Sequence, residues 1–174
     1  SLYSWARGRR AGFQGFSADE LRAFNEYVAR LGAMLTPGTH VCQVAVLYPA
    51  YSGWAHFVPS CARVYDRPFP ADFLRVSDAF DQVSARLIST QWDFDYVDDE
   101  SMWTGGVRGG ALHIADEDYR LIVLPACDVL HARTARKLAG FLAKGGKVVC
   151  AGCLPETLVN VTDRKRDRAA LRAL

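Results

Sequence analysis

Hydrophobic positions along this 174-residue chain follow two patterns, one with helical spacing and one made of short runs. Apolar residues recur every three or four positions in three stretches, and this spacing predicts amphipathic helices. The first helix begins at the "SADE" stretch from Ser17 and ends before Pro37, and the others cover residues 72–90 and 134–143. "SADE" matches a capping box, in which a serine and a glutamate bind amides of the first turn.

Four short segments with strand-like composition lie between or beside these helices. They are residues 41–47 (VCQVAVL), 93–98 (DFDYVD), 119–125 (YRLIVLP) and 147–151 (KVVCA). Continuous apolar runs are typical of strands that are buried on both faces of a parallel sheet. Because helices separate the strands, we predict an α/β domain with a three-layer, doubly wound parallel sheet. Such a domain is flavodoxin-like or class I glutamine amidotransferase-like.

The remaining segments complete the domain organisation. Residues 1–16 lack periodicity and interleave glycine and arginine with aromatic residues, so we interpret them as a linker that precedes a single domain over 17–174. Residues 50–70 are expected to form a long loop, and the charged tail over 163–174 a last helix. The glycine-rich residues 105–110 match neither a P-loop nor a dinucleotide-binding fingerprint.

Charge and composition narrow the classes of partner. The net charge is only +2, and acidic residues interrupt the basic stretch at 164–172, which favours a solvated helix face over a nucleic-acid site. No apolar run approaches the roughly 20 residues that span a bilayer, and no signal-peptide pattern is present, so we expect a soluble chain without membrane contact. Five cysteines without scaffold spacing suggest reduced thiols and a cytoplasmic location, although the sequence names no compartment.

Candidate ligand contacts gather after the predicted strands. In doubly wound sheets, ligands bind outside the carboxyl ends of the strands. The aromatic and acidic residues expected there are Tyr48, Trp54, Asp98, Asp99 and Trp103. The aromatic side chains can stack on sugar rings or pack against a neighbouring domain. The acidic run 98–100 can bind a divalent cation, or form a polar loop that caps the next turn.

The stretch "VVCAGCLPE" (148–156) contains a C-x-x-C pair, Cys150 and Cys153. A redox pair usually begins a helix, whereas this one begins inside a predicted buried strand. A zinc site would need Cys127 and His131 as further ligands, at a spacing that no standard zinc motif has. As a nucleophile, Cys150 lacks the preceding glycine of G-x-C-x-G and any histidine later in the chain. We therefore expect Cys150 to be a strand residue and Cys153 a loop residue, with no metal and no cofactor.

Four segments in a fixed order resemble a known family. They are residues 25–49 (NEYVARLGAMLTPGTHVCQVAVLYP), 93–102 (DFDYVDDESM), 110–130 (GALHIADEDYRLIVLPACDVL) and 138–156 (LAGFLAKGGKVVCAGCLPE). Together they resemble the amidotransferase-like domain that follows the catalytic barrel of large bacterial glycoside hydrolases. The resemblance covers residues 20–158 and is closest to the family 106 alpha-L-rhamnosidase type. The beta-galactosidase trimerisation domain is a more distant relative.

This resemblance implies a non-catalytic accessory or interface domain that packs beside the catalytic barrel of the same parent chain. In those enzymes the hydrolytic carboxylates belong to the barrel, so the parent is expected to be a glycoside hydrolase and this fragment not catalytic by itself. Residues 1–16 would then be the linker through which the chain exits the barrel. Carbohydrate would be the ligand at the strand ends, and a homo-oligomer is an expected assembly. The alternative is a Cys-dependent amidotransferase-like or hydrolase-like enzyme that uses Cys150 or Cys127. It requires a histidine within hydrogen-bond reach of the sulfur.

Overall fold

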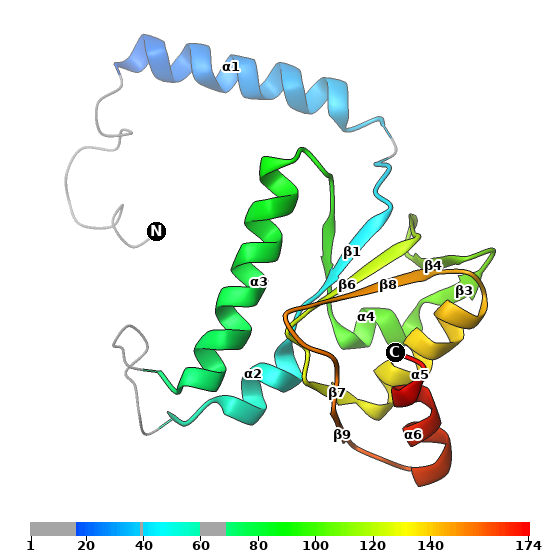
Figure 1. The fold of residues 1–174 in the computed structure, drawn as a ribbon. Helices are drawn as coiled ribbons and strands as arrows, with labels where there is room; N and C mark the ends of the chain where they lie inside the picture. The colour runs from blue at the N-terminus through cyan, green and yellow to red at the C-terminus, as the bar shows by residue number, and fades with distance from the viewer. Residues whose placement is uncertain (1–16, 39, 60–68) are drawn as a thin grey trace. The chain divides into compact units, whose positions relative to one another are not determined.

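The computed structural model describes residues 17–38, 40–59 and 69–174 (Figure 1). The chain divides into two compact units, Ser1–His40 and Val41–Leu174. The predicted linker over 1–16 and much of the predicted loop over 50–70 lie outside the described residues. None of the described helices is long and apolar enough to cross a membrane.

The described part of the first unit contains helix α1 (Ala18–Leu35), which begins as the sequence predicts. The Ser17 hydroxyl accepts a hydrogen bond from the Glu20 amide at 3.3 Å, and the Ser17 amide donates to the Glu20 carboxylate at 2.7 Å. These bonds from Ser17 lower the pKa of Glu20. The capping box is confirmed, and it fixes the first residue of the helix.

A four-stranded parallel sheet forms the centre of the second unit, in the order β2-β1-β6-β8. Its strands are β1 (Val44–Leu47), β2 (Asp95–Val97), β6 (Leu121–Pro125) and β8 (Lys147–Ala151). All four predicted strands are confirmed, and the order is that of flavodoxin-like sheets. The order reverses between β1 and β6, so the carboxyl ends of these two strands flank the position where such sheets bind ligands.

Successive residues of β1 point into two separate cores. Ala45 and Leu47 belong to one hydrophobic cluster with Met102, Leu138 and Phe141, which come from the helices on that face. Val44 and Val46 belong to the other cluster, with residues of the helix on the opposite face, Phe80, Val83 and Leu87. This alternation explains the uninterrupted apolar run, because both faces of the strand are covered.

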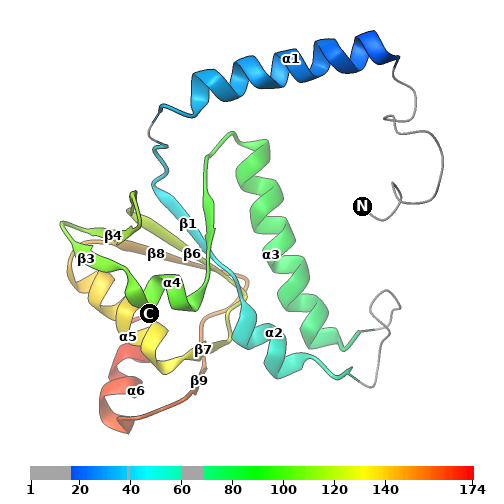
Figure 2. The same cartoon turned by 180° about the vertical axis from the view of Figure 1, so that it is seen from behind.

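Helices cover both faces of the sheet, which gives the predicted three-layer α/β fold (Figures 1 and 2). On one face lies α3 (Ala71–Ser89), which also contacts α2 (Ala50–His56). On the other face lie α4 (Asp99–Thr104) and α5 (Ala132–Ala143), and α6 (Arg164–Arg172) packs on α5. The predicted helices over 72–90, 134–143 and 163–174 are therefore confirmed as α3, α5 and α6.

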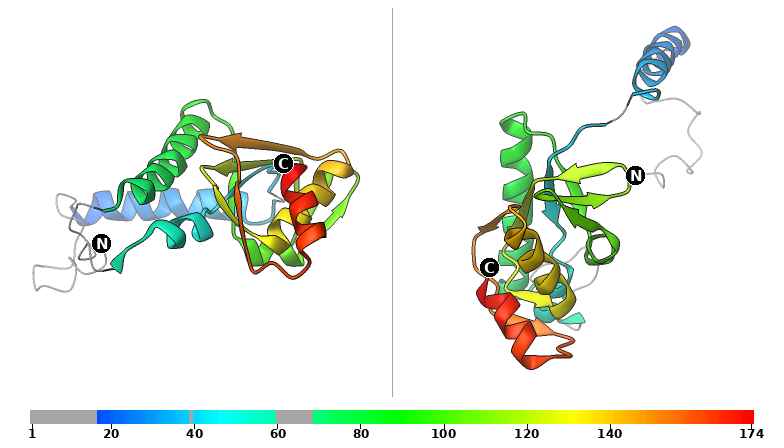
Figure 3. Two further views of the ribbon diagram at one scale, coloured as in Figure 1. Left: turned by 60° about the horizontal axis from the view of Figure 1, so that its bottom comes forward. Right: turned by 90° about the vertical axis from the view of Figure 1, so that its right-hand side faces the viewer.

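Two small sheets complete the unit (Figure 3). Strands β3 (Gly106–Arg108), β4 (Ala111–Ile114) and β5 (Glu117–Tyr119) are antiparallel, and β7 (Val129–His131) pairs in parallel with β9 (Thr157–Val159). Gly109 and Gly110 form the turn between β3 and β4 with φ of +57° and +73°. Two successive positive φ values are typical of a two-residue hairpin turn, so the glycine-rich segment closes a hairpin.

Two sequence expectations are wrong. The predicted loop over 50–70 begins with a helix, α2, because seven residues are too few to show a helical periodicity. The segment 148–150 was expected to be buried, but Val149 is 48% exposed. The reason is that β8 is an edge strand of the sheet, so that it has a neighbour on one side only.

Candidate functional site

The carboxyl end of β1 forms an aromatic groove between α2 and α3. Its volume is about 310 Å³, and it is lined by Tyr48, Pro49, Ala50, Gly53, Trp54, Phe57, Phe73, Val76, Ser77 and Phe80. Two of the five predicted contact residues, Tyr48 and Trp54, lie here and are 53% and 69% exposed. The structure thus brings these two residues together at the edge where ligands are expected.

Packed neighbours hold both exposed rings of the aromatic groove in place. The Tyr48 ring meets Phe80 edge-on at a centroid distance of 5.4 Å, and the Trp54 ring meets Tyr51 in the same way at 5.3 Å. Edge-to-face contacts of this kind are favourable aromatic geometries. Each ring is therefore supported at one edge while much of its surface remains open to a ligand.

A second hollow, of about 390 Å³, extends from Tyr48 toward the end of β2 and includes Tyr96, Asp98 and Ser101. Asp98 accepts a hydrogen bond from the Ser101 amide at 2.7 Å and caps α4. These bonds from Ser101 lower the pKa of Asp98. For Asp98, the expected cap of the next turn is confirmed, and its carboxylate remains beside the hollow that Tyr48 shares.

Asp99 and Trp103 lie apart from the groove, in a polar network between α4 and α5. The buried Thr134 hydroxyl accepts a hydrogen bond from Trp103 Nε1 at 2.7 Å and donates one to Asp99 Oδ1. Asp99 is only 7% exposed, and this burial raises its pKa. The Trp103 ring contacts His131 at 4.5 Å and lies under the Arg133 guanidinium at 5.1 Å. The five predicted residues therefore do not form one site.

Cys150 lies in β8 and Cys153 in the loop that follows, as predicted. Burial raises the pKa of Cys150 and raises that of Cys127 well above its usual value. The Cys127 thiol donates to the Pro125 carbonyl at 3.6 Å, and among the described residues no histidine hydrogen-bonds to either Cys127 or Cys150. In the described part of the chain, neither thiol thus has the histidine hydrogen bond that the Cys-dependent alternative requires.

Sequence reasoning missed a charged cluster centred on Asp128, in the loop after β6. His56 Nε2 lies 2.7 Å and Arg75 Nη2 lies 2.8 Å from Asp128 Oδ2, and Arg75 Nη1 lies 3.5 Å from Cys153 Sγ. Burial alone would raise the pKa of Asp128, but hydrogen bonds from His56 and Arg75 outweigh it and lower the pKa. The cluster connects α2 and α3 to the loop after β6, beside the position where the strand order reverses. His56 belongs to α2, and other residues of α2 line the aromatic groove.

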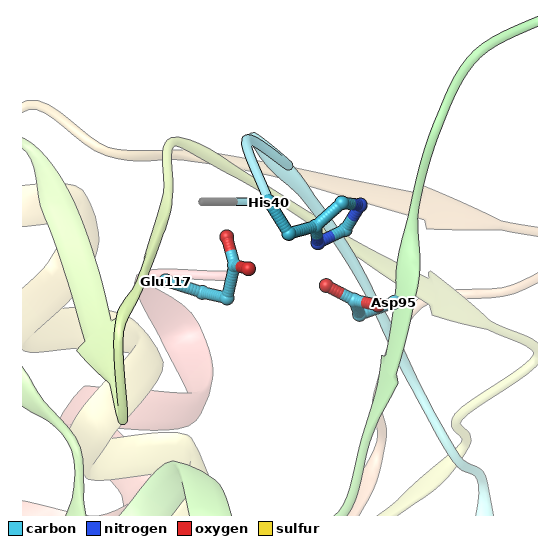
Figure 4. A group of neighbouring side chains, drawn as sticks. All are labelled: His40, Asp95 and Glu117. Atoms are coloured by element: carbon cyan, nitrogen blue, oxygen red, sulfur yellow. The ribbon is translucent and has the colours of Figure 1, made fainter. Parts of the chain in front are cut away.

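A carboxylate pair lies at the opposite, amino-terminal edge of the sheet (Figure 4). Carboxylate oxygens of Asp95 and Glu117 lie within 4.8 Å of each other. The Tyr119 hydroxyl donates to Asp95 at 3.0 Å, and the Cys42 amide donates to Glu117 at 3.3 Å. Donors from the fold therefore engage both carboxylates, and we assign no metal site to this pair.

His131 caps α5 and makes the stability of the domain sensitive to pH. Its Nδ1 accepts a hydrogen bond from the Arg133 amide at 3.0 Å, so the cap requires a neutral ring nitrogen. Burial lowers the pKa of His131, and the positive charges of Arg136 and Arg133 lower it further. A lowered folded-state pKa means that this stability is present above the unfolded value of about 6.5 and is lost as the pH falls through the folded value.

We expect the His131→Asn variant to show less acid destabilisation than the wild type. Asparagine is a good helix cap and does not titrate, so the pH dependence of the difference in unfolding free energy between the two proteins reports on the titration of His131. The measurement is urea denaturation at several pH values between about 5 and 8. Parallel pH profiles for the two proteins would contradict the assignment of His131 as a titrating cap.

Comparison with known proteins leaves the family open. No family model matches the chain, and no curated protein matches it. Among solved structures, the beta-galactosidase from Bifidobacterium adolescentis is similar, with 20% sequence identity and a TM-score of 0.39. The match covers 63% of this chain and 39% of that enzyme. The likeness to the rhamnosidase family is not shown by any of these comparisons.

Proposed function

We propose that this chain is a non-catalytic accessory domain of a carbohydrate-active glycoside hydrolase, which packs beside the catalytic barrel of the same parent protein. The observation that carries the proposal is the open aromatic groove at the carboxyl end of β1, with Tyr48 and Trp54 exposed at its rim. In this proposal the two rings contact a sugar chain that extends from the barrel.

The chemistry of the groove fits a sugar. Aromatic rings present apolar faces that can cover the C–H face of a sugar, while nearby polar groups bind its hydroxyls. Among the residues that line the groove is Ser77, and Asp98 lines the adjoining hollow. A volume of about 310 Å³ is at the lower end of the range for small-ligand sites, which suits one or two sugar units of a longer chain.

We expect Trp54→Ala to weaken the binding of neutral oligosaccharides by about tenfold or more, or ~1.4 kcal/mol. Titration calorimetry with galactose- and rhamnose-containing oligosaccharides measures this directly. Because Trp54 is 69% exposed, we expect the unfolding free energy to change by less than about 0.5 kcal/mol.

The matched control is Trp92→Ala. Trp92 is 63% exposed but precedes β2, so it lies at the opposite edge of the parallel sheet. Trp92→Ala should leave oligosaccharide binding unchanged. If both variants weaken binding equally, or if Trp54→Ala has no effect on it, the groove is not the sugar site.

A further inference from the structure

A basic cleft lies between α5 and the edge strand β3, on the face of the sheet opposite α3. Its volume is about 460 Å³, and four cationic side chains line it: Arg133, Arg136, Lys137 and Lys144. This size falls well within the range of ligand-binding clefts, roughly 300–1,000 Å³. The aromatic groove described above lies on a different set of elements, α2 and α3.

The four cations share one face of α5. The other three cations follow Arg133 by three, four and eleven positions. These spacings place side chains on the same side of a helix. Between Arg133 and Lys144 the helix rises about 16 Å, so the positive charge is spread along a line. Gly140 lies between them on this face, and a β-carbon there would meet no atom within 4 Å, so the middle of the line is open.

Few carboxylates balance this charge. Arg136 pairs with Asp167, and within the described part of the chain it is the one member of the four with an acidic partner. Lys137 Nζ donates to the Gly105 carbonyl at 2.6 Å, and Lys144 Nζ donates to the Val107 carbonyl at 2.7 Å. Arg133 lies over the Trp103 ring. Three cations therefore have neutral partners, and each keeps N–H donors for an anion.

The cations also repel one another. Burial lowers the pKa of Lys137, and the charges of Arg133 and Lys144 lower it further. The same neighbourhood affects His131, because Arg136 and Arg133 lower its pKa. A bound anion would remove this repulsion, which gives the cleft a physical reason to prefer a ligand with several negative charges.

We propose that this basic cleft binds an acidic oligosaccharide, with the cations of α5 contacting successive carboxylates along the sugar chain. The choice of a sugar as the carrier of the charge rests on the proposed function. A nucleic acid fits less well, since single strands stack successive bases on several aromatic side chains, and among the described residues Trp103 is the one aromatic residue that lines this cleft.

The test uses tetragalacturonate as the probe and its fully methyl-esterified form as the matched neutral ligand. Calorimetry should show that the wild-type chain binds the acid at least about tenfold more tightly than the ester, which as a neutral sugar has only the aromatic groove to bind. The Arg133→Gln/Lys144→Gln double variant should bind the acid about tenfold more weakly or worse, because two charge-assisted hydrogen bonds are lost. Both residues are exposed, so this variant is expected to fold.

The Arg86→Gln/Lys165→Gln variant makes the same charge change at exposed positions outside the cleft and should bind normally. Equal binding of the acid and the ester, or equal weakening by the two double variants, would overturn the proposal. So would tight binding of hexauridylate without binding of tetragalacturonate.

Trp54→Ala separates the two proposals, because it should weaken the binding of neutral sugars alone. If the acid fails to bind while neutral sugars still do, the basic cleft proposal falls and the proposed function stands.

Discussion

Gly146→Ala is expected to lower the free energy of unfolding by about 2–3 kcal/mol, the upper part of the roughly 1–3 kcal/mol that overpacking a full core costs. A β-carbon at this position would lie 2.3 Å from two ring atoms of Phe141. Phe141 is completely buried in the larger hydrophobic cluster, so its ring has no space into which it can move. Guanidinium or urea denaturation of the variant at neutral pH measures the loss.

The structure also shows why two glycines follow α5. Gly145 has a φ of +90°, which only glycine adopts without strain, and its amide donates to Leu142 while that of Gly146 donates to Phe141. This pair of bonds is a Schellman motif, which satisfies carbonyl groups in the last turn of α5. Gly145 is therefore required for its backbone conformation, and Gly146 for the space that the Phe141 ring occupies.

Gly140→Ala is the matched control. Gly140 lies inside α5, and an added β-carbon would meet no atom within 4 Å. Alanine is the better helix former, so this variant should be more stable by up to about 1 kcal/mol. Adding Phe141→Leu to Gly146→Ala should recover part of the lost stability. If it recovers none, or if both glycine variants shift stability in the same direction, the clash with Phe141 is not the cause.

The sequence was a good guide to the fold because the central strands carry a clear signal. The run around Val44 and Val46 is apolar at every position, which indicates a strand covered on both faces, and the structure places these valines against α3. The helices α3 and α5 are long enough to show a 3.6-residue period. By contrast, α2 has only seven residues, which are too few to show this period. Strands β7 and β9 pair with each other, although α5 and β8 separate them along the chain.

The candidate site was harder to predict, and the topology explains why. The sequence indicates which residues follow strands, but not the face of the sheet toward which each connection turns. The chain after β1 turns toward α2 and α3, which places Tyr48 and Trp54 in the aromatic groove. The chain after β2 turns toward α5, which places the buried Asp99 and the half-buried Trp103 on the other face. Residues that follow neighbouring strands at one edge of a sheet can therefore lie on opposite faces of it.

Thr134→Val is expected to lower the free energy of unfolding by about 2–4 kcal/mol. Valine has nearly the same shape as threonine but lacks the hydroxyl that joins Trp103 to Asp99. Thr134 is completely buried and Asp99 nearly so, which leaves little access for water to replace the lost bonds. The Asp99 carboxylate would lose a partner in a buried setting, and the Trp103 N–H would lose one in a half-buried setting.

The loss should depend on pH in a defined direction. Burial raises the pKa of Asp99, while the hydrogen bond from Thr134 lowers it, so removing that bond raises the pKa further. A raised folded-state pKa means that the stability of this group is present below the unfolded value of about 3.8 and is lost as the pH rises through the folded value. The deficit of Thr134→Val should therefore be larger at neutral pH than at about pH 4.5, where a larger share of the Asp99 carboxyl is protonated.

Denaturation of Thr134→Val, Thr134→Ser and Asp99→Asn at both pH values tests this account. Serine keeps the hydroxyl and loses only a methyl group, so Thr134→Ser should cost about 1 kcal/mol and keep the wild-type pH profile. Asp99→Asn removes the titrating group, and adding Thr134→Val to it should produce a deficit that no longer changes with pH. If valine costs no stability while serine does, the methyl group and not the hydroxyl holds α4 against α5. The polar network would then have no part in the stability of this face of the sheet.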